Sequence, residues 1–147
     1  MADIARNRQA GFKYNFLEKW EAGMQLQGSE VKSMRNGGVQ LKDSYATVRD
    51  GEVWLHNMHI APYAPASREN HEPERARKLL LHRGEIERLI GRTSEKGLTL
   101  IPTRLYWKNG RAKVEIALAR GKNVQDKRRY LKEKDARREI QQALQDR

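Results

Sequence analysis

Two hairpin turns restrict the fold of this chain more than any other feature. Asp50-Gly51 and Asn109-Gly110 each separate two runs in which apolar and polar residues alternate. Asp, Asn and Gly tolerate the positive φ angles that a two-residue turn requires, so both dipeptides favour a tight connection between antiparallel strands. The sequence therefore predicts two β-hairpins, each with a fixed register.

Counting outward from the first turn predicts the two faces of its hairpin. Val48 lies opposite Val53. Ala46 lies opposite Leu55 on the same side of the strands. The other side carries Tyr45, Thr47, Trp54 and His56. Because both sides carry apolar or aromatic groups, this hairpin is typical of a barrel wall with a core side and a binding side.

In the second hairpin the same count separates a polar face from an apolar one. Tyr106 lies opposite Lys113 on the outward face. Arg104 lies opposite Glu115 on that face. The other face carries Leu105, Trp107, Val114, Ile116 and Leu118. Pro102 has no amide hydrogen to donate, so it marks an edge or a bulge.

Capping residues predict two short helices. The first covers residues 29–36, with Ser29 accepting a hydrogen bond from the exposed amides and Gly37 ending the helix. The second covers residues 83–91, where Ile, Leu and Ile recur at helical spacing and Gly91 is suited to the C-terminal cap.

The remaining segments complete a mainly β protein with short helices. The first fourteen residues read as a basic arm, residues 14–20 as a strand, and the proline-rich residues 62–74 as an exposed loop. At least five short strands and two short helices most simply form a small antiparallel OB-fold-like barrel. We expect residues 1–121 to form this barrel with its arm, and residues 122–147 to form a basic tail.

The tail holds much of the charge. From Arg120 to Arg147 there are ten Lys or Arg and five Asp or Glu, which is +5 of the formal net charge of +11. Apolar residues recur at helical spacing only from Ala136 onward, and helices are costly to nucleate without a packed face. We therefore expect a tail that is disordered when free. It is either a solvated basic extension or a segment that folds on RNA.

The charge of the whole chain indicates a polyanionic partner. A net charge of +11 and a pI of about 10.1 favour nucleic acid, because Lys and Arg near phosphates release condensed counterions. An anionic membrane is the alternative. No stretch approaches the roughly 18 apolar residues of a spanning helix, and the start lacks the apolar centre of a signal peptide. A cytoplasmic location is expected.

The sequence offers little for catalysis. It contains no cysteine, which excludes disulfides, thiolate zinc sites and cysteine nucleophiles. Glu21, Glu30 and Asp43 are too scattered to identify a metal-dependent nuclease. His56 and His59 are an odd number of residues apart on a strand, so their side chains point to opposite faces. We expect no enzymatic activity, no metal and no cofactor.

Five stretches, in order, carry a resemblance to a known family. They read EAGMQLQGSEVKSMR, LKDSYATVRDGEVWLHNMHIAPY, RKLLLH, GLTLIPTRLYWKNGRAKVEIALARGKN and DKRRYLKEKDARRE. Together they resemble the SmpB family of SsrA-binding proteins from about Asn7 to the tail. The resemblance implies an oligonucleotide-binding barrel that binds the tRNA-like domain of transfer-messenger RNA. It also implies delivery of that RNA to stalled ribosomes in trans-translation.

The resemblance also implies RNA contacts in the barrel. Glu21, Leu80 and Lys113 match the RNA-contact positions of the family. At these positions Glu21 could accept a hydrogen bond from a base amine or a 2′-hydroxyl, Leu80 could pack against a base or a sugar, and Lys113 could bind a phosphate. Residue type alone also allows other roles: Glu21 could neutralise a nearby lysine, Leu80 could lie in the core, and Lys113 could be a solvated surface charge. Near the start, Asn7 and Arg8 match the family, and Lys13 partly replaces charge lost where Gly11 and Phe12 stand. Phe12 suits either the core or stacking on a base.

In the tail, the resemblance implies contacts with the small ribosomal subunit. The tail would enter the empty messenger channel and the decoding site and become helical there. Gln125 stands where some members have a ring that stacks on a ribosomal base, so stacking is not expected here. The matching positions are Asp126, Lys127, Arg128, Lys132, Lys134, Arg137 and Arg138.

The alternative function that involves no catalysis is that of a generic barrel that binds single-stranded RNA. Its stacking platform would draw on Tyr45, Trp54, Tyr63, Tyr106 and Trp107. The two alternatives differ in partner: a generic barrel binds many unstructured RNAs, whereas an SmpB-like protein prefers one folded RNA. Nothing in the sequence demands more than a monomer.

Overall fold

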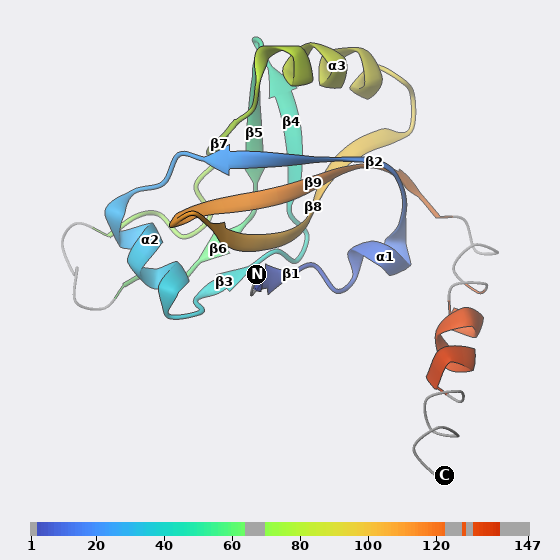
Figure 1. Ribbon diagram of the computed structural model, residues 1–147, viewed down its shortest axis with the longest axis horizontal. Coiled ribbons are helices and arrows are strands. Elements are labelled where there is room, and N and C mark those ends of the chain that lie inside the picture. Colours follow the sequence, from blue (N-terminus) through green and yellow to red (C-terminus); the bar gives the residue numbers. More distant parts are fainter. Residues whose placement is uncertain (1–2, 64–69, 123–127, 129–130, 139–147) are drawn as a thin grey trace.

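The computed structural model describes residues 3–63, 70–122, 128 and 131–138, and strands are the commonest regular structure among them (Figure 1). The elements are β1 (Asp3–Arg6), α1 (Ala10–Lys13), β2 (Tyr14–Met24), α2 (Gly28–Arg35), β3 (Val39–Gln40), β4 (Tyr45–Arg49), β5 (Glu52–His56), β6 (His59–Ile60), β7 (Arg77–Leu80), α3 (Arg83–Thr93), β8 (Leu98–Lys108) and β9 (Arg111–Gly121). Residues 131–138 form a further helix. The predicted class, mainly β with short helices, is confirmed.

The described strands close into an antiparallel barrel. Six follow one another in the order β8, β4, β5, β7, β2 and β9, and β9 pairs with β8 again. The first strand, β1, pairs with the second half of β8, while β3 and β6 form a separate two-stranded sheet. Figure 1 shows α3 beside one end of β4 and β5, and α2 beyond the arrowhead of β2. The predicted barrel is confirmed.

Both predicted hairpins form with the predicted registers. Asp50 and Gly51 have φ of 52° and 74°, and Asn109 and Gly110 have φ of 52° and 75°, as two left-handed residues in a tight turn require. The observed pairs include Val48 with Val53, Ala46 with Leu55, Tyr106 with Lys113 and Arg104 with Glu115. The register shifts between Pro102 and Arg104, where Pro102 indicated a bulge.

Alternation along the strands sends one set of side chains into the barrel. The core is aliphatic, and its fully buried members include Val53, Leu55, Leu105, Val114, Ile116 and Leu118. The four from the second hairpin were predicted on the face opposite its outward one, and Val53 and Leu55 were predicted to share one side of the first hairpin. Three strands, β2, β8 and β9, have 11 residues each, so they are longer than the short strands expected. Their length lets one strand turn a corner of the barrel and pair with different partners along its course.

The first residues are not the free basic arm that was predicted. Ile4 and Ala5 of β1 pack against the core, and the backbone of β1 pairs with β8. The Asn7 side chain then donates a hydrogen bond of 3.0 Å to the carbonyl oxygen of Pro102, and α1 follows. The arm prediction is wrong because backbone pairing with β8 and the packing of Ile4 and Ala5 are enough to hold this strand in place. Two apolar residues are too few to show the alternation by which a strand is recognised in a sequence.

Two predicted helix caps are also wrong. The carboxylate of Glu30 accepts a hydrogen bond from the Gln27 amide, so the N-cap of α2 is Gln27. The Ser29 hydroxyl contacts His71 instead. Gly91 lies within α3, which continues to Thr93.

The segment around residues 62–74 differs from the exposed loop that was predicted. His71 is buried, and β7 follows at Arg77–Leu80, where no strand was predicted. Residues 64–69 lie outside the described part.

In the tail, residues 131–138 are helical and all their side chains are exposed. Figure 1 shows this helix directed away from the barrel. Residues 123–127, 129–130 and 139–147 of the predicted disordered tail, which include Asp126 and Lys127, lie outside the described residues. Across the described ranges, no helix is both long enough and apolar enough to cross a membrane.

Candidate nucleic-acid interface

Three residues assigned to RNA contact meet on the outer wall of the barrel. Gly23 of β2 pairs with Leu80 of β7 on one side and with Lys113 of β9 on the other. Lys113 in turn pairs with Tyr106 of β8. Glu21 lies two residues before Gly23 and therefore on the same face of β2. Four neighbouring strands thus bring side chains from distant parts of the sequence into one row.

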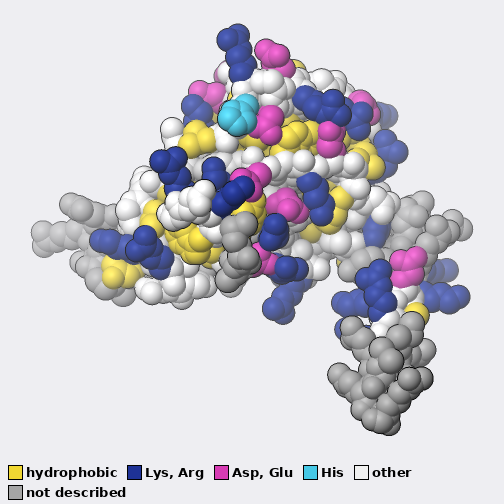
Figure 2. All heavy atoms as spheres, in the orientation of Figure 1, with side chains coloured by type: hydrophobic (Ala, Val, Ile, Leu, Met, Phe, Trp, Pro, Cys, Tyr) yellow, Lys and Arg dark blue, Asp and Glu magenta, His cyan; other side chains and the backbone are white. Residues whose placement is uncertain are grey.

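This row lines an open hollow of about 550 Å³, which also borders the start of α3. Glu21, Gly23, Leu80 and Lys113 all line it. The side chains offer an acceptor, an apolar face and a cation within one small area. We call these four residues the Glu21 hollow. On the face of the molecule in Figure 2, Lys and Arg side chains are interspersed with acidic ones rather than forming one uniform basic patch.

Leu80 is exposed, which rules out the core position that its residue type allowed. Its exposed fraction is 47%, whereas that of Leu79 is 1%. Successive side chains of a strand point to opposite faces, so Leu79 fills the core and Leu80 stands outside it. Exposure of a large apolar side chain within a polar surface leaves it available to pack against a base or a sugar.

The Glu21 carboxylate is hydrogen-bonded by Tyr106. The Tyr106 hydroxyl donates a hydrogen bond to Glu21 Oε2, and the Tyr106 ring is only 2% exposed. Lys108 Nζ lies 3.1 Å from Glu21 Oε1. The Tyr106 hydrogen bond, with that of Lys108, outweighs burial and holds the pKa of Glu21 below its ordinary value. Glu21 therefore neutralises a lysine, as one alternative expected, and is an ionised acceptor at neutral pH.

Lys113 is half-buried beside the same carboxylate. Among the described residues it makes no hydrogen bond or ion pair within 4.0 Å, although its charge also lowers the pKa of Glu21. Its ammonium group lies 3.5 Å from the position that a Cβ on Gly23 would occupy. A cation held at the rim without a partner of its own suits a phosphate oxygen.

The other predicted barrel contacts lie elsewhere, outside the lining of the Glu21 hollow. Asn7 anchors the backbone through Pro102, and Lys13 Nζ lies 3.5 Å from Asp43 Oδ1. Arg8 is exposed, and Phe12 is half-buried. The structure therefore brings together Glu21, Leu80 and Lys113 in one hollow, whose lining does not include Asn7, Arg8 or Lys13.

The aromatic platform of a generic RNA binder is only partly present. Tyr106 is buried, so its assignment to that platform is wrong. Tyr45 is exposed and stacks on His56 with ring centroids 5.1 Å apart. Arg35 lies 5.8 Å from the ring centroid of Trp107 and covers it. Trp54 is half-buried.

In the tail, the matched basic residues that are described are all exposed, and those from Lys132 to Arg138 lie in the helix at residues 131–138. Arg128, Lys132, Lys134, Arg137 and Arg138 are all exposed. Lys134 lines a shallow hollow together with Arg8. A helix whose side chains are all exposed leaves its charges available to an external surface.

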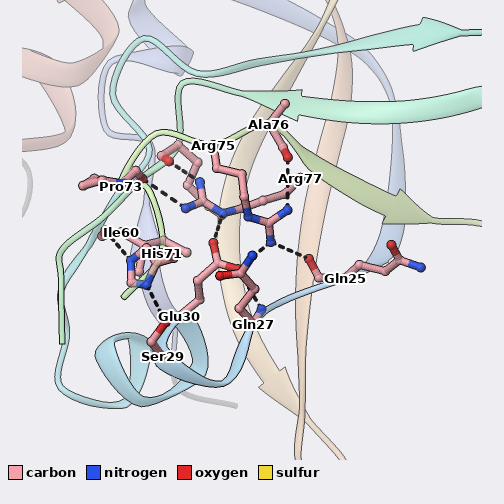
Figure 3. A network of polar contacts seen from close by, with 11 residues as sticks. Gln25, Gln27, Ser29, Glu30, Ile60, His71, Pro73, Arg75, Ala76 and Arg77 are labelled. Atoms are coloured by element: carbon pink, nitrogen blue, oxygen red, sulfur yellow. Dashed lines mark hydrogen bonds and ion pairs between the residues drawn. The ribbon is translucent and has the colours of Figure 1, made fainter. Parts of the chain in front are cut away.

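A buried ion network, which the sequence did not reveal, ties α2 to the strand that carries Leu80 (Figure 3). Glu30 is fully buried, and its carboxylate lies 2.5 Å from Arg77 Nε and 2.5 Å from Arg75 Nη2. Arg77 also donates to the carbonyl oxygens of Met58 and Pro73. Beside it, His71 bridges Ser29 and the Ile60 carbonyl. A buried, fully paired arginine at the start of β7 fixes that strand.

The Glu30 carboxylate is ionised within this network. Burial alone would raise the pKa of Glu30, but hydrogen bonds from Arg75, the Gln27 amide and Arg77 outweigh burial and hold the pKa below its ordinary value. The only signal in the sequence was a charged residue, Arg77, shortly before three leucines in RKLLL, and this pattern does not indicate which residue pairs with Arg77.

Barrel, charge and hollow define a small basic protein with the surface chemistry of a nucleic-acid-binding domain. Comparison with known proteins makes this specific. The chain belongs to the SmpB protein family, which it matches over residues 4–146.

Relatives in this family match almost the whole chain. The SsrA-binding protein of Carboxydothermus hydrogenoformans is 56% identical over 141 residues, covering 96% of this chain and 95% of its own. That of Geobacillus thermodenitrificans is 57% identical over 144 residues, covering 98% and 93%. A solved structure described as "tmRNA-SmpB: a journey to the center of the bacterial ribosome" is 46% identical, with a TM-score of 0.68, covering 86% of this chain and 92% of the other.

Proposed function

We propose that this protein binds the tRNA-like domain of transfer-messenger RNA, the SsrA RNA, and is required for its delivery to stalled ribosomes in trans-translation. Membership of the SmpB family supports this proposal, as does the similarity to relatives that are SsrA-binding proteins. The observation that carries it is the convergence of Glu21, Leu80 and Lys113 on one exposed hollow. The protein acts in the cytoplasm by binding and not by catalysis.

Each side chain of the hollow has a distinct part in RNA recognition. Leu80 packs against an unpaired base or a sugar. Lys113 binds a phosphate. Glu21, which would repel a phosphate, accepts a hydrogen bond from a base amine or a 2′-hydroxyl and so selects for the RNA features that present one. Contacts of this kind favour a folded RNA with exposed loop nucleotides over any strand of equal charge.

In this proposal one part of the chain binds transfer-messenger RNA and another part binds the small ribosomal subunit. In this proposal residues 1–121 bind the RNA, and residues 122–147 enter the empty messenger channel and the decoding site of the small subunit. The basic side chains at residues 131–138 support the second role, because all of them are exposed. Asn7, Arg8 and Lys13 contribute contacts from a separate surface of the barrel.

Binding selectivity tests the proposal. We expect the full-length protein to bind a transcript of the tRNA-like domain at least a hundredfold more tightly than an unstructured RNA of equal length, measured at one fixed salt concentration. Equal affinity for both RNAs would instead favour a generic single-stranded RNA binder.

Lys113→Ala is expected to weaken binding to the tRNA-like domain and to reduce its salt dependence. A single phosphate contact contributes about one unit to the slope of log affinity against log salt. The matched control is Lys96→Ala, which removes an exposed lysine from the turn after α3 and should leave the slope unchanged. An unchanged slope in Lys113→Ala would mean that this ammonium contacts no phosphate.

Tyr106→Phe is expected to lower RNA affinity about tenfold although Tyr106 itself is buried. The Phe ring keeps the packing, but Glu21 loses the donor that orients it, and hydrogen bonds to charged groups are worth about 1.5–3 kcal/mol. If Tyr106 acts only through Glu21, the same change made in a Glu21→Ala background, which has no acceptor for the hydroxyl, should have almost no further effect on affinity. Additive losses in that double variant would contradict this coupling.

A further inference from the structure

Gly23 lies at the centre of the Glu21 hollow, and nothing in the fold requires a glycine there. It is buried one residue before the end of β2, where it still pairs with Leu80 on one side and Lys113 on the other. Its φ is outside the left-handed region, unlike those of Gly51 and Gly110 in the hairpin turns. Glycine in a strand interior weakens the strand, because it has no side chain to pack and loses more freedom on folding.

Space does not require a glycine at this position either. A Cβ on Gly23 would lie 3.4 Å from Leu80 Cβ, 3.5 Å from Lys113 Nζ and 3.7 Å from Leu80 Cδ1, which are ordinary contact distances. Gly38 differs, because a Cβ there would come within 2.7 Å of Ser33 Oγ. Alanine at position 23 therefore fits the free protein, and neither the φ angle nor the packing at this position requires a glycine.

We propose that Gly23 is a specificity-determining residue of the hollow, leaving a slot through which the edge of an unpaired RNA base reaches the backbone of β2. The inference rests on the proposed function. The slot is narrow, since Leu80 and Lys113 both lie within contact distance of one carbon position. A flat ring entering edge-on fits such a slot, with Leu80 against its face and the Glu21 carboxylate two residues along the strand.

The depth of the slot also explains how the hollow distinguishes RNA structures. Paired bases stay within their stack and present only groove edges, whereas an unpaired base can be splayed out and inserted. A methyl group at position 23 would occupy the bottom of the slot and keep the base away from Glu21. It would leave the Lys113 ammonium at the rim, so the phosphate contact would persist.

Gly23→Ala tests the inference directly. We expect its affinity for a transcript of the tRNA-like domain to fall about tenfold, with the salt slope unchanged and the melting temperature equal to or above that of the wild type. Gly84→Ala, at an exposed glycine with nothing within 4 Å of the added methyl group, is the matched control and should bind like the wild type. In a Leu80→Ala background, Gly23→Ala should cost less, because the base has already lost its apolar wall.

The possible failures are distinguishable. Wild-type selectivity for the tRNA-like domain together with unchanged affinity in Gly23→Ala overturns only the role of Gly23. A fall in both melting temperature and affinity overturns it as well, because Gly23 would then be a packing residue. If the wild-type protein itself shows no preference for the tRNA-like domain, the proposed function fails and this inference fails with it.

Discussion

Deleting residues 123–147 is expected to abolish peptide tagging on stalled ribosomes while changing affinity for the tRNA-like domain less than about threefold. The four residues of the Glu21 hollow lie on β2, β7 and β9, outside the deleted segment, so the deletion leaves the hollow intact. The tail carries much of the net charge, and the small expected loss of affinity reflects weakened long-range attraction at physiological salt. Filter binding and a reconstituted tagging reaction measure the two effects separately.

A tail of the same composition in scrambled order is the control for this deletion. It keeps the charge and length but loses the order of basic and acidic residues, including that at residues 131–138. We expect it to bind the RNA like the wild type and to fail in tagging. Tagging by the scrambled variant would show that the tail acts only as a charged extension. A large loss of RNA affinity on deletion would refute the division of labour between barrel and tail.

Arg77→Met is expected to lower the free energy of unfolding by about 3–5 kcal/mol, because it leaves the buried Glu30 carboxylate without one of its two cations. Urea denaturation at neutral pH measures the loss. The neighbouring substitution Lys78→Met is the matched control: the ion pair of Lys78 with Glu52 is partly exposed, so breaking it should cost about 1 kcal/mol or less. Equal losses in the two variants would contradict the role of the buried network.

The same network predicts a dependence on pH. Because the pKa of Glu30 is lower in the folded protein than its ordinary 4.5, ionised Glu30 contributes stability above pH 4.5. That contribution is lost as the pH falls from 4.5 through the lowered folded value. The Arg77→Met variant should show a weaker dependence over this window. An identical pH dependence in both proteins would mean that Arg77 does not hold Glu30 in its charged form.

Local chemistry made the hairpins predictable. Asp50-Gly51 and Asn109-Gly110 each set a turn, and the two-residue period of a strand then fixed every pair outward to Arg104 and Glu115. Contacts between distant segments could not be predicted in this way. The strand β1 is stabilised by pairing with β8, which is distant in the sequence. Likewise, the contact between Ser29 and His71 joins residues that are far apart along the chain.

The candidate site shows the same division between local and distant information. Resemblance to a family supplied Glu21, Leu80 and Lys113, but residue type alone favoured a buried Leu80. Only the pairing of β7 with β2 reveals that Leu80 stands on the outer face beside Gly23. The hydrogen bond from Tyr106 to Glu21 links residues 85 positions apart, so no sequence pattern indicated it.

Sequencing of the RNA that crosslinks to the full-length protein in its native cells tests the central claim most directly. The proposed function predicts that one RNA with a tRNA-like end dominates, together with fragments of small-subunit ribosomal RNA from the decoding site. Crosslinks in the tRNA-like domain should diminish in a Glu21→Ala/Lys113→Ala double variant. Reads scattered over many messages and unstructured regions, unchanged in that variant, would contradict the proposed function and identify the barrel as a general RNA binder.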